Sequence, residues 1–239
     1  MQSIFKRYEK KYLITVEQSI ILQQIMSQYM VPDQHDEYLV QNLYYDTDRW
    51  DIVQTSINKP LYKEKMRLRC YGEAHHKSEF YLELKKKYKG IVYKRRITIP
   101  AQSLVNSSVH TVVSETQSQI SRELDFYFRE NEIAEKIYIS YQRIAFVGKE
   151  AKELRVTFDA DIRFRLGDLI FSNSTDGQHI LSEDKMIMEI KTPVGMPLWM
   201  ASALTENNIF PTAFSKFGIC YTEHIYKHIC EERTANICA

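Results

Sequence analysis

The sequence predicts one α+β domain over residues 1–239, built on a closed eight-stranded antiparallel β-barrel that is flanked by helices. Three observations favour this class. Charged and apolar residues alternate along several runs, which is the two-residue period of a β-strand. Segments with helical spacing are confined to the two ends and one crossover. Seven Gly and six Pro are too few for long low-complexity linkers.

The first expected strand lies within residues 5–15 and leads into a helix. Thr15 is a suitable N-cap with Gln18 three residues later, and Pro32 bounds the helix. The alternation then predicts strands at 38–47, 62–71, 78–87, 91–99, 134–147, 153–165 and 186–192, and a short one at 167–172.

Helices are expected in four further places. Residues 46–56 form a short helix or a turn, and the segment 106–132 contains a helix that uses Ile120, Leu124 and Phe128. Two more follow Pro197, in "PLWMASALTEN" and "FGICYTEHIYKHICEE".

Composition excludes several classes of protein. The net charge is +1, so a basic site must come from local clustering. Four cysteines without CxxC spacing indicate reduced thiols in a cytoplasmic protein: Cys70, Cys220, Cys230 and Cys238. The N-terminus lacks the apolar core of an export signal, and no apolar run approaches the ~18 residues of a membrane span.

Basic residues dominate the charged faces of the expected strands. Arg67 and Arg69 share a face, and so do Glu83 and Lys85. A sheet with one solvated face explains each strand taken alone. On a closed barrel, however, the cations would converge on the lumen and repel one another unless an anion neutralises them. This favours a phosphate polyanion as ligand, with a few glutamates left to hold a divalent metal.

An ordered set of motifs from about Phe5 to Tyr221 resembles a known family. The motifs are "FKRYEKKYLI", "NLYYDT", "KEKMRLRCYG", "YLELKKK", "VYKRR", "ISYQRIAF", "LRVTFD", "IMEIK" and "FSKFG". Together they are similar to the polyphosphate polymerase (VTC) domain of the CYTH-like triphosphate tunnel metalloenzymes. That resemblance implies an eight-stranded barrel around a charged tunnel.

The resemblance also implies site residues, carried over motif by motif. The catalytic residues expected from it are Lys11, Arg67, Arg69, Lys85, Lys94, Arg143, Arg155, Lys191 and Lys216. The expected substrate-binding residues are Arg7, Arg96, Tyr141 and Ser215, and the expected metal ligands are Glu189 and Glu83.

The implied activity is a polyphosphate polymerase that uses ATP with Mn²⁺ or Mg²⁺. Hydrolytic relatives begin with an ExExK strand, whereas here Arg7 replaces the first glutamate, which favours the polymerase. Two alternatives stay open: an inorganic or nucleoside triphosphatase in which Glu9 orients water, and a non-catalytic polyphosphate-binding subunit. Nucleic acid is not an expected partner, because "KKKYKGIVYKRR" alternates with apolar residues. A membrane-protein partner in trans and the oligomeric state are also left open.

Overall fold

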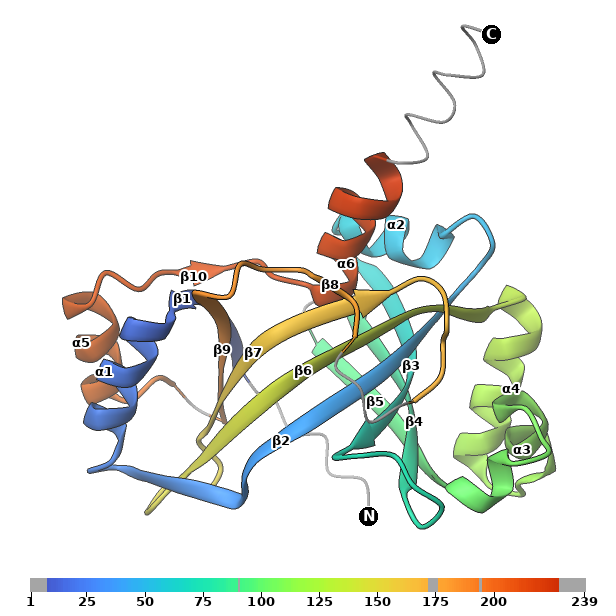
Figure 1. The fold of residues 1–239 in the computed structure, drawn as a ribbon, viewed down its shortest axis with the longest axis horizontal. Coiled ribbons are helices and arrows are strands. Elements are labelled where there is room, and N and C mark those ends of the chain that lie inside the picture. The colour runs from blue at the N-terminus through green and yellow to red at the C-terminus, as the bar shows by residue number, and fades with distance from the viewer. Residues whose placement is uncertain (1–7, 90, 172–175, 194, 228–239) are drawn as a thin grey trace, which may run out of the picture. The chain divides into compact units, whose positions relative to one another are not determined.

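A computed structural model describes residues 8–89, 91–171, 176–193 and 195–227 (Figure 1). The helices are α1 (Val16–Met26), α2 (Asp51–Ile57), α3 (Val109–Glu115), α4 (Gln119–Asn131), α5 (Leu198–Glu206) and α6 (Lys216–Cys220), with a 3₁₀ turn at Ala101–Leu104 and a π turn at Tyr221–Ile225. The long strands are β1 (Tyr8–Thr15), β2 (Met30–Asp46), β3 (Tyr62–Tyr71), β4 (Glu79–Tyr88), β5 (Ile91–Pro100), β6 (Ala134–Gly148), β7 (Arg155–Arg165) and β9 (Lys185–Thr192). Two strands have two residues each, β8 (Gln178–His179) and β10 (Pro211–Thr212).

The predicted α+β class is confirmed, but the predicted closed barrel is wrong. The strand order is β10-β1-β9-β7-β6-β2-β3-β4-β5, with β8 paired to β7. Over the residues that the structure describes, this path has two ends, and no pairing joins β5 to β10 or β1. Alternation of side chains defines two faces for each strand whether a sheet is open or closed. The sequence pattern therefore could not decide closure.

The eight long strands expected from the sequence are present, with different ends for some, whereas the expected short strand is not found among the described residues. Strand β2 begins at Met30 rather than near residue 38, and no strand forms at 167–171, the described part of the expected 167–172 segment. The predicted capping box is confirmed: Thr15 Oγ1 accepts from Gln18 N at 3.1 Å, and Thr15 N donates to Gln18 Oε1 at 3.0 Å.

The chain divides into two units. Unit 1 comprises residues 1–40, 140–163 and 177–214, and unit 2 comprises 41–139, 164–176 and 215–239, so that β2, β6 and β7 contribute to both. The prediction of a single domain stays a prediction.

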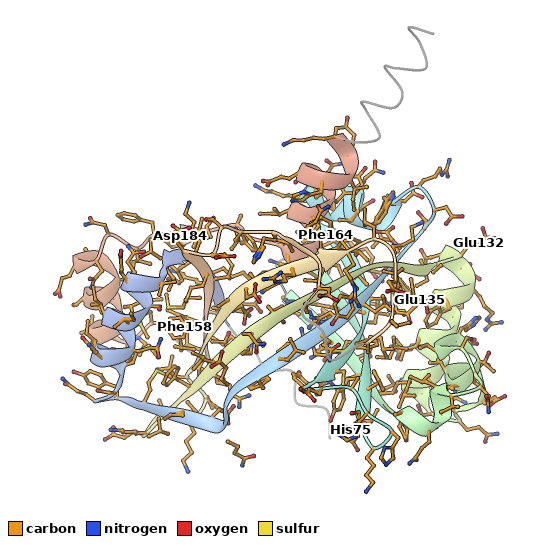
Figure 2. The ribbon with its side chains drawn as sticks, in the orientation of Figure 1. His75, Glu132, Glu135, Phe158, Phe164 and Asp184 are labelled. Carbon is orange, nitrogen blue, oxygen red and sulfur yellow. The ribbon has the colours of Figure 1, made fainter. Side chains whose placement is uncertain are left out.

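Unit 1 has its own core, in which α1 and α5 lie beside each other (Figure 1). The apolar sides of β1, β7 and β9 supply Tyr12, Phe158 and Met188, which are at most 2% exposed, and α1 adds Leu22. Phe158 is labelled in Figure 2. Burying this side leaves the charged side of the three strands on the opposite face.

Unit 2 has a second core, formed between the β3–β4–β5 sheet and helices α3 and α4. Met66 and Leu84 from the sheet are fully buried, and they pack in one cluster with Val113, Leu124 and Phe128 from the helices. The predicted helical spacing of Leu124 and Phe128 is thereby confirmed. As in unit 1, the charged residues of these strands point away from the core.

Candidate functional site

One face of the β3–β4–β5 sheet in unit 2 carries basic side chains in adjacent rows. Residues directly opposite each other in antiparallel strands point to the same face, so the strand register decides which side chains meet. The expected pairs Arg67/Arg69 and Glu83/Lys85 lie on this face together. Read across β3, β4 and β5, the rows are Lys65–Lys85–Lys94, Arg67–Glu83–Arg96 and Arg69–Tyr81–Thr98.

Glu83 is the carboxylate at the centre of this basic face and is 1% exposed. Its Oε2 accepts from Nε and Nη2 of Arg67 at 2.9 and 2.8 Å. Its Oε1 lies 2.6 Å from Lys94 Nζ and accepts from Arg96 Nε at 2.8 Å. Burial alone would raise the pKa of Glu83, but Arg67, Arg69 and Lys94 outweigh it and hold that pKa far below its usual range. Glu83 is therefore ionised, with its charge divided among several cations.

Lys94 is a cation whose charge depends on pH near neutrality. Burial is the largest influence and lowers the pKa of Lys94 to about 8, with Glu83 opposing the change and Arg67 and Arg96 adding to it. The Lys94 side chain is still 44% exposed, so a ligand can reach it. A bound anion would favour the charged form of this lysine.

The arginines of the face are held by neutral partners as well as by Glu83. Arg69, 5% exposed, donates from Nε to Asn42 Oδ1 at 2.8 Å. Tyr71 OH accepts from Arg69 Nη1 at 3.3 Å and from Arg96 Nη2 at 3.2 Å. The guanidinium of Arg96 also lies 4.3 Å from the ring centroid of Tyr81. These contacts fix the orientation of the guanidinium groups, which favours bidentate binding of phosphate oxygens.

Lys65 belongs to the face but was missed in the sequence analysis. It precedes Arg67 by two residues, so the alternation that identified Arg67 also applied to it. Its Nζ donates to Ser215 Oγ at 2.8 Å, and Ser215 is the N-cap of α6. Lys216, the first residue of α6, is half-buried. The predicted Ser215–Lys216 pair therefore lies beside the basic face within unit 2.

A second charged face lies in unit 1, on β1, β9 and β7. Lys11 is directly opposite Glu189, and Glu9 is directly opposite Lys191, so charges of opposite sign meet across the strands. Read across β1, β9 and β7, the rows are Glu9–Lys191–Arg155 and Lys11–Glu189–Thr157.

Glu189 is the buried acid of this face, at 8% exposure. Its Oε1 lies 2.9 Å from Lys191 Nζ. Burial alone would raise the pKa of Glu189, but Lys191, Lys11 and Arg143 hold it well below its usual range. The neighbouring Thr157 Oγ1 is buried and has no hydrogen-bond partner within the described ranges. The face thus offers a carboxylate and a hydroxyl, both able to bind a further group.

Two arginines of unit 1 have carboxylate partners. Arg143 forms a bidentate pair with Asp159, at 2.6 Å from Nε to Oδ1 and 2.8 Å from Nη2 to Oδ2, and both residues are buried. The guanidinium also lies 5.2 Å from the ring centroid of Tyr141. The more exposed Arg155 donates to Asp33 at 2.5 Å. A phosphate bound here would share these arginines with their acids.

The two expected metal ligands differ in how well they fit a divalent cation. Across the part of the chain that the structure describes, no three His, Cys, Asp or Glu residues form a group that could hold a metal ion. Both carboxylate oxygens of Glu83 are engaged by cations, so the arrangement does not favour Glu83 as a ligand. Glu189 fits as a single carboxylate ligand beside the Thr157 hydroxyl, provided that substrate oxygens complete the shell.

The structure thus divides the expected residues between the units, and Arg7 lies outside the described residues. Unit 2 contains Arg67, Arg69, Glu83, Lys85, Lys94, Arg96, Ser215 and Lys216. Unit 1 contains Lys11, Tyr141, Arg143, Arg155, Glu189 and Lys191. Their roles stay predictions.

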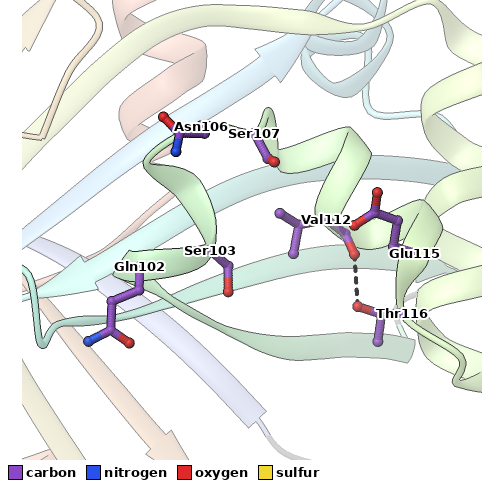
Figure 3. A pocket seen from close by; sticks show the side chains of 7 residues that line it. All are labelled: Gln102, Ser103, Asn106, Ser107, Val112, Glu115 and Thr116. Carbon is purple, nitrogen blue, oxygen red and sulfur yellow. Dashed lines mark hydrogen bonds between the residues drawn. The ribbon is translucent and has the colours of Figure 1, made fainter.

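A separate polar hollow of about 400 Å³ lies between the 3₁₀ turn and α3 (Figure 3). Its lining consists of Gln102, Ser103, Asn106, Ser107, Val112, Glu115 and Thr116. The lining includes one acid and no Lys, Arg or His, so it does not suit a phosphate.

Comparisons with known proteins show the family of the chain and a similar fold. The family model described as the VTC domain matches residues 6–224. An X-ray structure described as a "putative adenylate cyclase" from Vibrio parahaemolyticus is similar in fold, with a TM-score of 0.50 and 11% identity over 92% of this chain and 100% of that one. A Pyrococcus horikoshii protein matches with a TM-score of 0.38 and 13% identity over 84% of this chain and 86% of that one. No match was found among curated proteins.

Proposed function

The chain belongs to the VTC domain family of the triphosphate tunnel superfamily, and on this premise we propose that it is a metal-dependent polyphosphate polymerase. It would transfer the γ-phosphoryl group of ATP to the end of an inorganic polyphosphate chain. The observation that carries the proposal is the basic face of unit 2, where six lysines and arginines in three adjacent rows surround the single carboxylate of Glu83.

The proposed reaction needs no strong general base. A terminal phosphate oxygen of the acceptor is ionised near neutral pH and attacks the γ-phosphorus of ATP. The bond from that phosphorus to the β,γ-bridging oxygen breaks, ADP leaves, and the polymer gains one phosphate. Catalysis then comes from in-line positioning and neutralisation of charge.

The residues of unit 2 suit the binding of a triphosphate. Arg67 and Arg69 present guanidinium groups whose orientation is fixed by Glu83 and Asn42. Lys85 and Lys94 lie directly opposite each other in the next row and supply point charges. In this proposal the arginines orient the phosphates, and the lysines neutralise charge that develops as the β,γ bond breaks.

The residues of unit 1 suit a second set of phosphate contacts and a metal ligand. Lys11, Lys191 and Arg155 would bind phosphate oxygens, and Arg143, held by Asp159, would contribute from a fixed position. Glu189 would bind Mn²⁺ or Mg²⁺. Such an ion would supply positive charge that offsets the charge of the phosphates.

The test is incubation of the full chain with ATP and Mn²⁺, with the products resolved on a gel. Long-chain polyphosphate supports the proposal. Release of orthophosphate alone would indicate a triphosphatase instead, and binding without turnover would indicate a polyphosphate-binding subunit. Glu189→Gln should abolish the metal-dependent turnover, whereas Glu206→Gln, at an exposed position on α5 of the same unit, should leave it unchanged. Full turnover by Glu189→Gln would contradict the metal assignment.

A further inference from the structure

The end of the β4–β5 hairpin exposes apolar and aromatic side chains. Tyr62, Tyr88 and Ile91 lie directly opposite one another across β3, β4 and β5, and they are 44%, 46% and 45% exposed. They share a sheet face with Met66 and Leu84, which are fully buried in the core of unit 2. At this end of the hairpin, beyond the charged row of Glu64 and Lys86, the same face exposes apolar and aromatic side chains to solvent.

Three neighbours enlarge this exposed surface. Leu61 is 70% exposed and accepts from Lys89 N through its carbonyl oxygen at 2.9 Å, which places it beside the turn of the hairpin. On β5, Tyr93 shares the sheet face of Ile91 whereas Val92 lies on the opposite face, and each is 39% exposed. We call the six residues the hairpin patch: Leu61, Tyr62, Tyr88, Ile91, Val92 and Tyr93.

Lysines lie at the same end of the hairpin as the hairpin patch. Lys63 and Lys87 are directly opposite each other on the sheet face that also carries Val92, so two like charges meet there, behind Tyr62 and Tyr88. Burial, and next the charges of Lys87 and Lys59, lower the pKa of Lys63. Lys89 Nζ lies 5.4 Å from the ring centroid of Tyr88. An anionic surface would relieve this repulsion.

We propose that the hairpin patch docks on the surface of a lipid bilayer that contains anionic lipids. Three of its six residues are tyrosines, whose apolar rings and polar hydroxyls suit the boundary between acyl chains and headgroups. The lysines at this end of the hairpin match the negative charge of such a surface.

The docking would be peripheral. Within the ranges that the structure describes, no helix is long and apolar enough to cross a membrane. The row next to Tyr62 and Tyr88 on the same face contains the Lys86–Glu64 ion pair, at 3.2 Å, so on β3 and β4 the exposed apolar side chains end after one row, and Tyr93 extends the patch on β5 alone. The patch is therefore confined to the tip of the hairpin, which suits shallow insertion.

The test is co-flotation of the full chain with vesicles of phosphatidylcholine alone or with about 30% phosphatidylserine, in the absence of nucleotide. We expect binding to the anionic vesicles only. The double variant Tyr88→Ser/Ile91→Ser should lose this binding because it removes the apolar contact with the bilayer. The double variant Lys59→Glu/Lys89→Glu should also lose it, because each lysine near an anionic surface contributes about fivefold in partitioning.

The matched control replaces two apolar residues elsewhere in unit 2 that are more exposed than Tyr88 and Ile91, as Val105→Ser/Phe126→Ser, at 74% and 58% exposure. It should bind vesicles like the parent chain. Circular dichroism and tripolyphosphate binding without lipid identify a variant that has failed to fold and keep this test independent of the polymerase assay.

Three results would overturn the proposal. The first is no flotation with anionic vesicles, and the second is equal flotation of the patch variants and the parent chain. The third is a parent chain that does not float and sediments as a dimer, while the variant Tyr88→Ser/Ile91→Ser sediments as a monomer. That result would assign the patch to contact with a second copy of this chain. Equal binding to neutral vesicles would refute the role of the lysines.

Discussion

Replacing Glu83 with Gln tests the electrostatic organisation of the basic face. The change keeps the size of the side chain but removes the carboxylate that Arg67, Lys94 and Arg96 share. Removing one partner of a buried ion pair costs roughly 3–5 kcal/mol. The side chains of Lys94 and Arg96 are 44% and 38% exposed, so water takes up part of this loss. We expect the free energy of unfolding to fall by about 2–3 kcal/mol.

For a chain of 239 residues, this loss corresponds to a decrease in Tm of roughly 4–12 °C. Scanning calorimetry at pH 7 measures it. The matched control is Glu123→Gln, which removes a pair of similar length in the same unit, 2.8 Å from Arg95 Nε, but with partners 29% and 33% exposed. That change should cost less than about 1 kcal/mol.

The same experiment links stability to binding. Once Glu83 is neutral, the cations around it repel one another, and tripolyphosphate should raise the Tm of Glu83→Gln by more than that of the parent chain. A Glu83→Gln variant that melts within about 2 °C of the parent, or no lower than Glu123→Gln, would refute the reasoning. Glu83 would then not be the residue that neutralises this face.

Three further predictions concern other charged groups. Because burial lowers the pKa of Lys94 to about 8, the lysine loses its charge as pH rises through that value, and affinity for tripolyphosphate should fall. Measured by calorimetric titration, the affinity should fall by up to ~tenfold between pH 7 and pH 9, and this fall should be absent in Lys94→Met. Asp159→Asn leaves Arg143 buried without its carboxylate partner, so the free energy of unfolding, measured with urea, should fall by about 3–5 kcal/mol. An unchanged urea midpoint would contradict the pairing. Lys65→Met should weaken tripolyphosphate binding about fivefold, whereas Lys77→Met in the exposed β3–β4 turn should not, and equal effects would remove Lys65 from the site.

Much of each charged face could be predicted from the sequence because a strand has a two-residue period. Arg67 and Arg69, or Glu83 and Lys85, share a face in any strand that contains them. The two-residue period does not determine the register between neighbouring strands. That Glu83 is opposite both Arg67 and Arg96 follows from the register of two hairpins, which local patterns leave open.

Contacts over long sequence separations could not be predicted for the same reason. Lys65 and Ser215 are 150 positions apart, and no pattern in either segment indicates the other. The predicted closed barrel is wrong because β5 is an edge strand, at one end of the strand order. Its sequence nevertheless has the same alternation as an interior strand. Edge and interior strands of an antiparallel sheet can have the same side-chain alternation.

The basic face of unit 2 is better explained by a ligand than by stability. Its three rows carry six cations and one carboxylate, and Glu83 can compensate only part of their charge. A fold selected only for stability would place neutral side chains at some of these positions, because like charges at this spacing repel. The core that holds the sheet lies on the other face and does not require them. A polyanion would turn this repulsion into attraction, and its binding would stabilise the folded chain by mass action.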